Sequence, residues 1–317
     1  MNVGETRNVV RLGLVGAGRW GRVFIRTIAP MEGIELFGLA SSNPASRELV
    51  PAGCCVTNDW RDLLSSADLD GIIVATPPSS HVEIAKSGVE AGLGVLAEKP
   101  LTLNEREAES LLHLTKHCQG FVLVDHTHLF NPAYIKLKEV AQLLGPIQGI
   151  RSIAGNWGLF RQDSPVLWDW GSHDVAMCLD LVGSMPTEVR ARRVEVRETE
   201  HCGGEILFLQ LAFEQNISAE ITIGNIMEHK KRILEVDFQD KTLIFNDLSD
   251  QKLKVRQRHA KDWDEGEAVE IDKTLPLTRV ISQFSEMLRE GQRGLESLQL
   301  GVNVVKVLSK LDHCLQI

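Results

Sequence analysis

Three side chains, Lys99, Asp169 and His173, have the chemistry needed to move a proton at a hydroxyl group. Histidine titrates near neutral pH, so His173 is suited to the transfer, and Lys99 could hold positive charge beside the oxygen or share the proton. Asp169 and His173 are four residues apart, so one helix would direct both to the same side. The sequence leaves open which of His173 and Lys99 is the base. A solvated loop lysine and a carboxylate capping a helix start are the structural alternatives.

Glycines at 16, 18 and 21 form a G-x-G-x-x-G pattern directly after an apolar run and at the opening of a helical pattern. Gly16 permits a tight turn, Gly18 lets the backbone approach a pyrophosphate, and Gly21 lets the helix pack on the strand. The free N–H groups at the start of that helix favour phosphate. The motif predicts a dinucleotide site, and a purely structural turn is the alternative.

The end of the second expected strand bears on which dinucleotide is bound. It reads Leu39-Ala40-Ser41-Ser42-Asn43, without the carboxylate that would bind the ribose diol of NAD. Ser41 and Ser42 can donate hydrogen bonds, and Arg47 follows within reach of a phosphate. We therefore expect NAD or NADP, with a slight preference for NADP. The alternative is a simple turn followed by a solvated arginine.

The elements that would position these residues alternate regularly in the first third of the chain. Strands are expected at 9–15, 35–40, 71–75, 94–97 and 121–124, and helices lie between them. Ser80 is expected to cap one helix, and Thr102 with Glu105 forms a T-x-x-E capping box before another. This alternation predicts a doubly wound parallel sheet of the Rossmann type.

The second part of the chain has a different rhythm. A helical segment at 132–144 precedes successive strands from 187 to about 256, and two helices close the chain at 276–290 and 297–311. Consecutive strands predict an open, largely antiparallel mixed sheet, so the fold class is α/β with two domains. We place a dinucleotide-binding domain at 1–124 and a substrate-binding and oligomerisation domain at 125–317.

Four segments together resemble the glucose–fructose oxidoreductase/inositol dehydrogenase (Gfo/Idh/MocA) family. They are VGAGRWG at 15–21, ATPPSSH at 75–81, AEKP at 97–100 and WDWGSHD at 168–174, in the family's order and spacing. The resemblance implies a tightly held NAD or NADP and hydride transfer at a secondary alcohol of a sugar or cyclitol. It places Lys99 of the E-K-P motif beside the nicotinamide, and it matches Asp169 and His173 to the family's aspartate and histidine.

The resemblance and the glycine motif together give the expected cofactor residues. These are Gly16, Ala17, Gly18, Arg19, Trp20, Gly21, Ser41, Ser42, Arg47, Ala75, Thr76, Pro77, His81, Glu98 and Lys99. For His81, a helix cap or an ordinary helix residue is an equal alternative.

Weaker candidates for substrate contacts are His128, Arg161 and Trp168. An aromatic face near an arginine suits a sugar or nucleobase, although tryptophans more often pack in the core. The stretches around FNP at 130–132 and LWD at 167–169 are most similar to family members that oxidise nucleotide-linked amino sugars.

Composition limits the other possible partners. The net charge of −9 argues against nucleic acid or an anionic membrane surface. No long apolar run and no signal-peptide core are seen, and six scattered cysteines read as reduced thiols, so a cytoplasmic protein is expected. Four grouped metal ligands cannot be assembled, so no metal is expected. A homo-oligomer, dimer or tetramer, follows from the resemblance alone.

Two other functions remain open at this point. The chain could bind the dinucleotide as a regulatory or accessory protein without turnover. It could also reduce a group other than a carbonyl, such as an imine or enone, on the same scaffold. Lys99, Asp169 and His173 together favour the enzyme, because a sensor would not need all three.

Overall fold

The chain folds into two compact units, each built from two segments. The computed structural model describes residues 9–158, 160–161, 164–198, 203–258 and 266–316, so Cys202 lies outside the described part. One unit comprises Met1–Asp125 with Leu277–Val302, and the other comprises His126–Pro276 with Asn303–Ile317. The predicted single boundary at 124/125 therefore does not account for 277–302, which return to the first unit.

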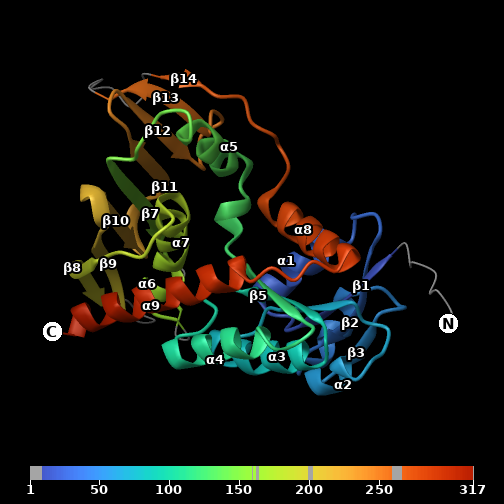
Figure 1. The fold of residues 1–317 in the computed structure, drawn as a ribbon. Helices are drawn as coiled ribbons and strands as arrows, with labels where there is room; N and C mark the ends of the chain where they lie inside the picture. The colour runs from blue at the N-terminus through green and yellow to red at the C-terminus, as the bar shows by residue number, and fades with distance from the viewer. Residues whose placement is uncertain (1–8, 159, 162–163, 199–202, 259–265, 317) are drawn as a thin grey trace. The chain divides into compact units, whose positions relative to one another are not determined.

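The first unit contains a six-stranded parallel sheet in the order β3-β2-β1-β4-β5-β6 (Figure 1). Its elements, in chain order, are β1 (Val10–Val15), α1 (Arg19–Ile28), β2 (Ile34–Ala40), η1 (Pro44–Leu49), β3 (Cys55–Thr57), α2 (Trp60–Leu64), β4 (Gly71–Val74), α3 (Pro78–Glu90), β5 (Gly94–Glu98), α4 (Glu105–Thr115) and β6 (Phe121–Asp125). The four residues of β4 and the five of β5 are all buried, as expected for strands covered on both faces. The predicted doubly wound sheet is confirmed.

The helix α8 (Pro276–Glu290) explains why a late segment belongs to the first unit. The Phe284 ring packs edge-to-face on Phe121 of β6, with centroids 5.7 Å apart. Gly71 and Gly94 leave room for α8, since a Cβ on Gly71 would lie 2.9 Å from Phe284 Cζ. Long-range apolar packing, which local patterns do not encode, decides this assignment. The last helix is α9 (Glu296–Gln316).

The second unit is built on an eight-stranded sheet in the order β14-β13-β12-β11-β7-β10-β9-β8. Its elements are η2 (Thr127–Phe130), α5 (Pro132–Ala141), β7 (Gly149–Trp157), α6 (Val166–Asp169), α7 (Gly171–Val182), β8 (Glu188–Glu198), β9 (Gly203–Ala212), η3 (Glu214–Asn216), β10 (Ser218–Gly224), β11 (Ile226–Asp237), β12 (Lys241–Asn246), β13 (Leu253–Gln257) and β14 (Glu267–Ala268). Among the described strands of this sheet, β7 and β10 alone pair in parallel, so the predicted largely antiparallel mixed sheet is confirmed.

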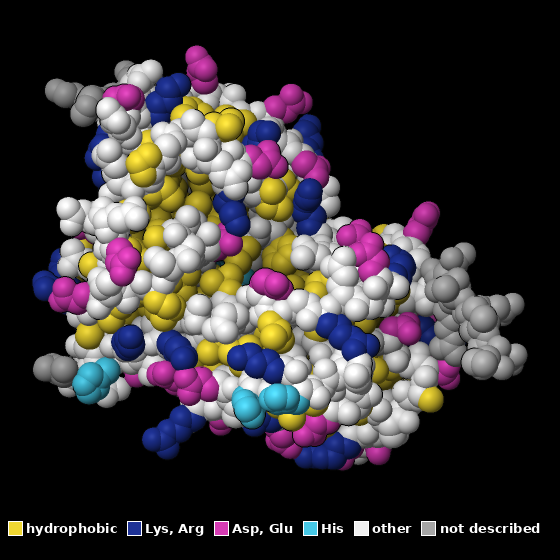
Figure 2. Space-filling view, in the orientation of Figure 1, with side chains coloured by type: hydrophobic (Ala, Val, Ile, Leu, Met, Phe, Trp, Pro, Cys, Tyr) yellow, Lys and Arg dark blue, Asp and Glu magenta, His cyan; other side chains and the backbone are white. Residues whose placement is uncertain are grey.

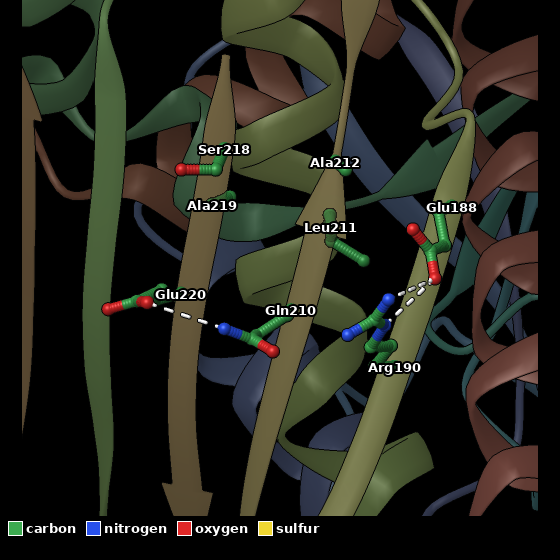
Figure 3. A pocket seen from close by; sticks show the side chains of 8 residues that line it. All are labelled: Glu188, Arg190, Gln210, Leu211, Ala212, Ser218, Ala219 and Glu220. Atoms are coloured by element: carbon green, nitrogen blue, oxygen red, sulfur yellow. Dashed lines mark hydrogen bonds and ion pairs between the residues drawn. The ribbon is translucent and has the colours of Figure 1, made fainter. Parts of the chain in front are cut away.

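One face of this second sheet packs on helix α7, and the other face carries polar and half-buried side chains. Leu209, Ile221 and Ile150 alternate toward the buried face. On the opposite face, Arg190, Gln210 and Glu220 stand in register across β8, β9 and β10 and line a shallow hollow of about 260 Å³ (Figure 3). We call this the outer face.

Two predicted helix starts were wrong. Helix α3 begins at Pro78, and Ser80 lies inside it, donating to Thr76 Oγ1 (2.8 Å) instead of capping the helix. Helix α4 is capped by Asn104, whose side chain accepts from the N–H groups of Arg106 and Glu107. Thr102 lies outside the helix, where its hydroxyl accepts from the Asn104 N–H and donates to Glu107. Asparagine competes well with threonine for this role, which explains the shift.

Surface features agree with the composition. Figure 2 shows acidic and basic side chains interspersed over the face in view. The five described cysteines carry free thiols. None of the described helices has the length and hydropathy needed to cross a membrane.

Candidate functional site

The glycine motif forms the turn between β1 and α1, as predicted. Gly16 has a φ of +99°, which disfavours any side chain, and a Cβ there would lie 2.6 Å from the Ala75 carbonyl oxygen. A Cβ on Gly21 would collide with the Gly16 carbonyl oxygen, so helix and turn pack backbone to backbone. Gly18 is the N-cap of α1, and no atom lies within 4 Å of the position its Cβ would take. The turn therefore packs tightly against protein backbone at Gly16 and Gly21, whereas the space beside Gly18 is open.

A cavity of about 500 Å³ opens beside this turn, at the carboxyl ends of β1, β2 and β4. It lies where the strand order reverses, between β1 and β4. Eight predicted cofactor residues line it: Gly16, Ala17, Gly18, Ser41, Ser42, Ala75, Thr76 and Pro77. Parallel α/β sheets bind ligands at this position. The first turn of α1 contains no acidic residue, so its N–H groups are free of competing negative charge there.

Several other predicted cofactor residues of this unit do not line the cavity. Arg47 donates to the carbonyl oxygens of Cys54 (2.6 Å) and Ala52 (2.9 Å), and it is not among the residues lining the cavity. Arg19 and Trp20 do not line it either. The cavity is instead completed by residues that the motif did not indicate, among them Arg22 and Trp60.

Trp60 opens α2 after its N-cap Asp59, and the Arg61 guanidinium lies 4.2 Å from the centre of its ring. A cation over one ring face holds the indole in place and leaves the rest of the ring available for stacking. No sequence motif marks this position, because β3 and α2 bring it to the cavity through the fold.

His81 connects two loops of the first unit. Its side chain is 1% exposed, with Nδ1 2.9 Å from the Pro100 carbonyl oxygen and Nε2 2.7 Å from the Thr76 carbonyl oxygen. Burial lowers the pKa of His81, and the two carbonyls only partly oppose this effect. His81 does not line the cavity, but it ties the cavity residue Thr76 to the residue that follows Lys99.

Lys99 and Glu98 lie at the carboxyl end of β5. Their exposed fractions are 7% and 5%, and the Lys99 N–H donates to Glu98 Oε2 at 3.2 Å. Across the sheet, Glu98 is in register with Asp125, which is fully buried at the end of β6. Three buried ionisable residues thus lie at the carboxyl ends of two neighbouring strands, which is typical of a functional site because burial of charge is costly. Asp125 was not singled out in the sequence.

Asp169 and His173 lie in the second unit. They were expected on one helix, but they lie on two. Asp169 ends α6, and His173 lies in the first turn of α7 after Trp170. The Arg161 Nη1 lies 3.5 Å from Asp169 Oδ1, so Asp169 forms an ion pair with a second predicted residue. Together with Ser164 and Trp170 these two residues line a small polar cavity of about 110 Å³. Trp168 is buried in α6, as the packing alternative for that residue expects.

His173 packs against His128, the remaining predicted substrate residue. The two imidazole centres are 4.2 Å apart with planes tilted by 34°. Arg232 of β11, which no motif indicated, lies with its Nη1 3.1 Å from His128 Nε2. The second unit thus collects two histidines, an arginine and the Asp169–Arg161 pair from η2, β11 and the region of α6 and α7.

The first unit fits a nicotinamide dinucleotide. Gly18 leaves the backbone uncovered, the cavity follows the turn, and Ser41 with Ser42 stands where an adenosine ribose would be held. A cavity of this size and lining is suited to part of such a ligand.

Comparison with known proteins agrees with this assignment. Residues 10–126 match the model GFO_IDH_MocA, an oxidoreductase family with an NAD-binding Rossmann fold. A crystal structure from Magnetospirillum magnetotacticum MS-1, of a protein described only as a candidate oxidoreductase, is 40% identical. It has a TM-score of 0.90 and the match covers 96% of this chain and 99% of that one. UDP-N-acetylglucosamine 3-dehydrogenase GnnA from Acidithiobacillus ferrooxidans shares the fold, with a TM-score of 0.83, 21% identity and coverage of 96% and 97%.

Curated relatives match over shorter stretches. The rhizopine catabolism protein MocA of Rhizobium meliloti is 28% identical over 57% of this chain and 59% of its own length. For the inositol 2-dehydrogenase of R. meliloti strain 1021 the identity is 22%, over 57% and 58%. The chain thus spans less than two thirds of the length of these relatives.

Proposed function

The chain belongs to the Gfo/Idh/MocA family of oxidoreductases, and from this premise we propose that it is an NAD(P)-dependent dehydrogenase or reductase acting on CH–OH groups. The observation that carries the proposal is the cavity at the glycine turn, which suits part of a dinucleotide and lies in the same unit as the buried Lys99. The substrate class is a sugar-like secondary alcohol or ketone.

The proposed chemistry uses three residues, Lys99, His173 and Asp169. A bound nicotinamide supplies the hydride acceptor or donor. Lys99 stabilises the negative charge that develops on the substrate oxygen as its proton leaves, and His173 accepts that proton or returns it in the reverse direction. Asp169, held by Arg161, binds a neighbouring hydroxyl or orients the imidazole. The alternative in which Lys99 is the base uses the same atoms with the two roles exchanged.

Cofactor choice is proposed to favour NADP slightly. The support is the lining at the end of β2, where Ser41, Ser42 and Asn43 stand and no carboxylate is present among the described lining residues. A carboxylate there would repel a 2′-phosphate, and the nearby Arg22 would attract one.

A nucleotide-linked amino sugar is the substrate that we favour within this class. The support is a relative from A. ferrooxidans named UDP-N-acetylglucosamine 3-dehydrogenase, which is 24% identical over 73% of this chain. The similar FNP and LWD stretches point in the same direction.

We also propose that the protein is a homo-oligomer, with a second copy on the outer face of the second sheet. There Ile153, Phe208 and Ile233 are only half-buried, in a row beside charged residues of both signs. Half-exposed apolar side chains on a broad sheet face are typical of an interface.

The first experiment is a parallel fluorescence titration with NADH and NADPH. Wild type, Lys99→Ala and, as a matched control, the exposed Lys116→Ala are then assayed with sugars and nucleotide sugars. We expect one reduced cofactor to bind more tightly. Substrate-dependent turnover should be lost by at least about a hundredfold in Lys99→Ala alone.

The other outcomes are informative. If neither cofactor bound, the proposal would be wrong and the glycine turn would be structural. If a cofactor bound but no tested substrate reacted with wild type, the regulatory or accessory function would gain support.

A further inference from the structure

Arg232 is a charged residue beside the candidate catalytic histidine that the proposed chemistry does not use. It lies on β11, its side chain is 30% exposed, and its Nη1 donates to His128 Nε2 at 3.1 Å. A guanidinium can only donate, so His128 Nε2 must accept here. Within the described part of the chain this is the one hydrogen bond of the guanidinium, and its buried Nε has no hydrogen-bond partner. Arg232 therefore has unused donors.

A neighbouring carboxylate, that of Asp247, forms an ion pair with Arg232 but accepts no hydrogen bond from it. Asp247 Oδ1 already accepts from Lys252 Nζ and from Asn131 Nδ2, each at 2.9 Å. Its Oδ2 lies 3.8 Å from Arg232 Nη1, beyond hydrogen-bond distance. Burial opposes ionisation of Asp247, but the bond and charge of Lys252 outweigh it and lower the pKa of this carboxyl. The single charge of Asp247 is thus shared between Lys252 and Arg232, so this carboxylate alone does not neutralise both cations.

The geometry also fixes where the charge of Arg232 lies. The Trp170 ring is 5.8 Å from the guanidinium carbon, and the His128 ring contacts both Arg232 and His173. Arg232 therefore lies one imidazole away from the residue proposed to move the proton. An arginine held by an aromatic ring and a histidine, with donors to spare, matches the planar fork of a carboxylate or phosphate.

We infer that Arg232 is a binding residue for an anionic group of the substrate, a carboxylate or a phosphate, held beside the reacting carbon. The inference rests on the proposed function, because it places the substrate at His173. It narrows the substrate from any polyol to one that carries a negative charge. A purely structural arginine would hold His128 but would not distinguish charged from neutral ligands.

The test is calorimetric titration of the full-length protein saturated with its preferred reduced cofactor. The probes are D-glucuronate for the carboxylate, D-glucose 6-phosphate for the phosphate, and D-glucose as the neutral counterpart. The variants are Arg232→Gln, Arg232→Lys and, as a control for charge alone, Lys230→Gln, an exposed position on the same strand. Wild type should bind one anionic probe at least about tenfold more tightly than glucose.

Arg232→Gln should weaken binding of that anion by about tenfold to a hundredfold and leave glucose unchanged. Arg232→Lys should recover part of the loss, and Lys230→Gln should match wild type. The stronger anion identifies the source, carboxylate or phosphate.

Two results would overturn the inference. Wild type could bind neither anion better than glucose, or Arg232→Gln could weaken all three probes equally, as a structural role through His128 predicts. Measuring cofactor binding in the same samples distinguishes failure of this inference from failure of the proposed function. Intact binding without anion preference removes only this inference, whereas absent cofactor binding removes the proposed function together with it.

Discussion

At the scale of single residues, His81 shows how one buried side chain links parts of a site that the sequence presents separately. Its two ring nitrogens reach the carbonyls of Thr76 and Pro100, which follow different strands of the first sheet. The ATPPSSH segment suggested a cap or a cofactor contact, and neither describes this bridge. A hydrogen bond to a backbone carbonyl leaves no trace in the pattern of residue types, so only the fold reveals it.

The buried imidazole predicts a particular dependence of stability on pH. Because the folded pKa of His81 is lowered, the unfolded chain takes up this proton first as the pH falls. The contribution of His81 to stability is then complete above about pH 6.5 and declines below it. In urea unfolding, His81→Gln should cost about 1–3 kcal/mol at pH 8, and the difference from wild type should narrow at pH 5.5.

The exposed His113→Gln on α4 is the matched control and should leave both the stability and its pH dependence unchanged. A difference between His81→Gln and wild type that is the same at both pH values would contradict the assignment of a neutral, buried imidazole.

At the scale of elements, the turn from β1 to α1 separates glycines that pack against the protein from one that is open to the cavity. Gly16 and Gly21 face protein backbone, whereas Gly18 faces open space. The sequence predicted the tight turn at Gly16 and the close helix packing at Gly21 correctly, because the motif is local and its geometry is compact, whereas the pyrophosphate role of Gly18 stays a prediction. The sequence predicted Asp169 and His173 on one helix wrongly, because the break at Trp170 depends on packing around α6 and α7.

Alanine substitutions should separate the two roles. Gly21→Ala should lower the free energy of unfolding by about 1–3 kcal/mol, since its methyl group meets the Gly16 carbonyl. Gly18→Ala should keep or slightly raise stability, because its φ of −67° suits alanine. It should nevertheless weaken cofactor binding at least about tenfold, because the methyl group takes space needed by the pyrophosphate.

Urea unfolding without cofactor and a reduced-cofactor titration measure the two effects. Gly53→Ala, which also meets nothing within 4 Å but does not line the cavity, should change neither. If Gly18→Ala bound the cofactor like wild type, the turn would not be the pyrophosphate site.

At the scale of the whole molecule, the two sheets agree with the sequence prediction. Some segments and side chains that pack near them come from distant parts of the sequence and were not predicted. Strand–helix alternation and then successive strands predicted a parallel and a mixed sheet. The placement of α8 in the first unit and of Arg232 beside His128, a residue 104 positions away, was not predictable. Both depend on contacts between distant segments, which periodicity and motifs do not record.

The outer face predicts the assembly. We expect wild type to sediment as a dimer or tetramer in analytical ultracentrifugation. Ile153→Lys, on β7 in the middle of the outer face, should reduce the mass at least to half. Leu143→Lys, at a position 83% exposed and away from that face, should assemble like wild type. A monomeric wild type, or an Ile153→Lys variant that stays assembled, would exclude this interface.

The packing of α8 on the first sheet has a consequence for how the gene of this protein can evolve by recombination. The first unit is not encoded by one contiguous stretch of the gene, because Phe284 and its neighbours pack on Gly71, Gly94 and Phe121 from a segment much further along the chain. A recombination event near codon 125 would exchange the first sheet without its cover. The later part of the gene must therefore change together with the earlier part, and new substrate specificities are expected to arise by substitution within this chain more readily than by shuffling its halves.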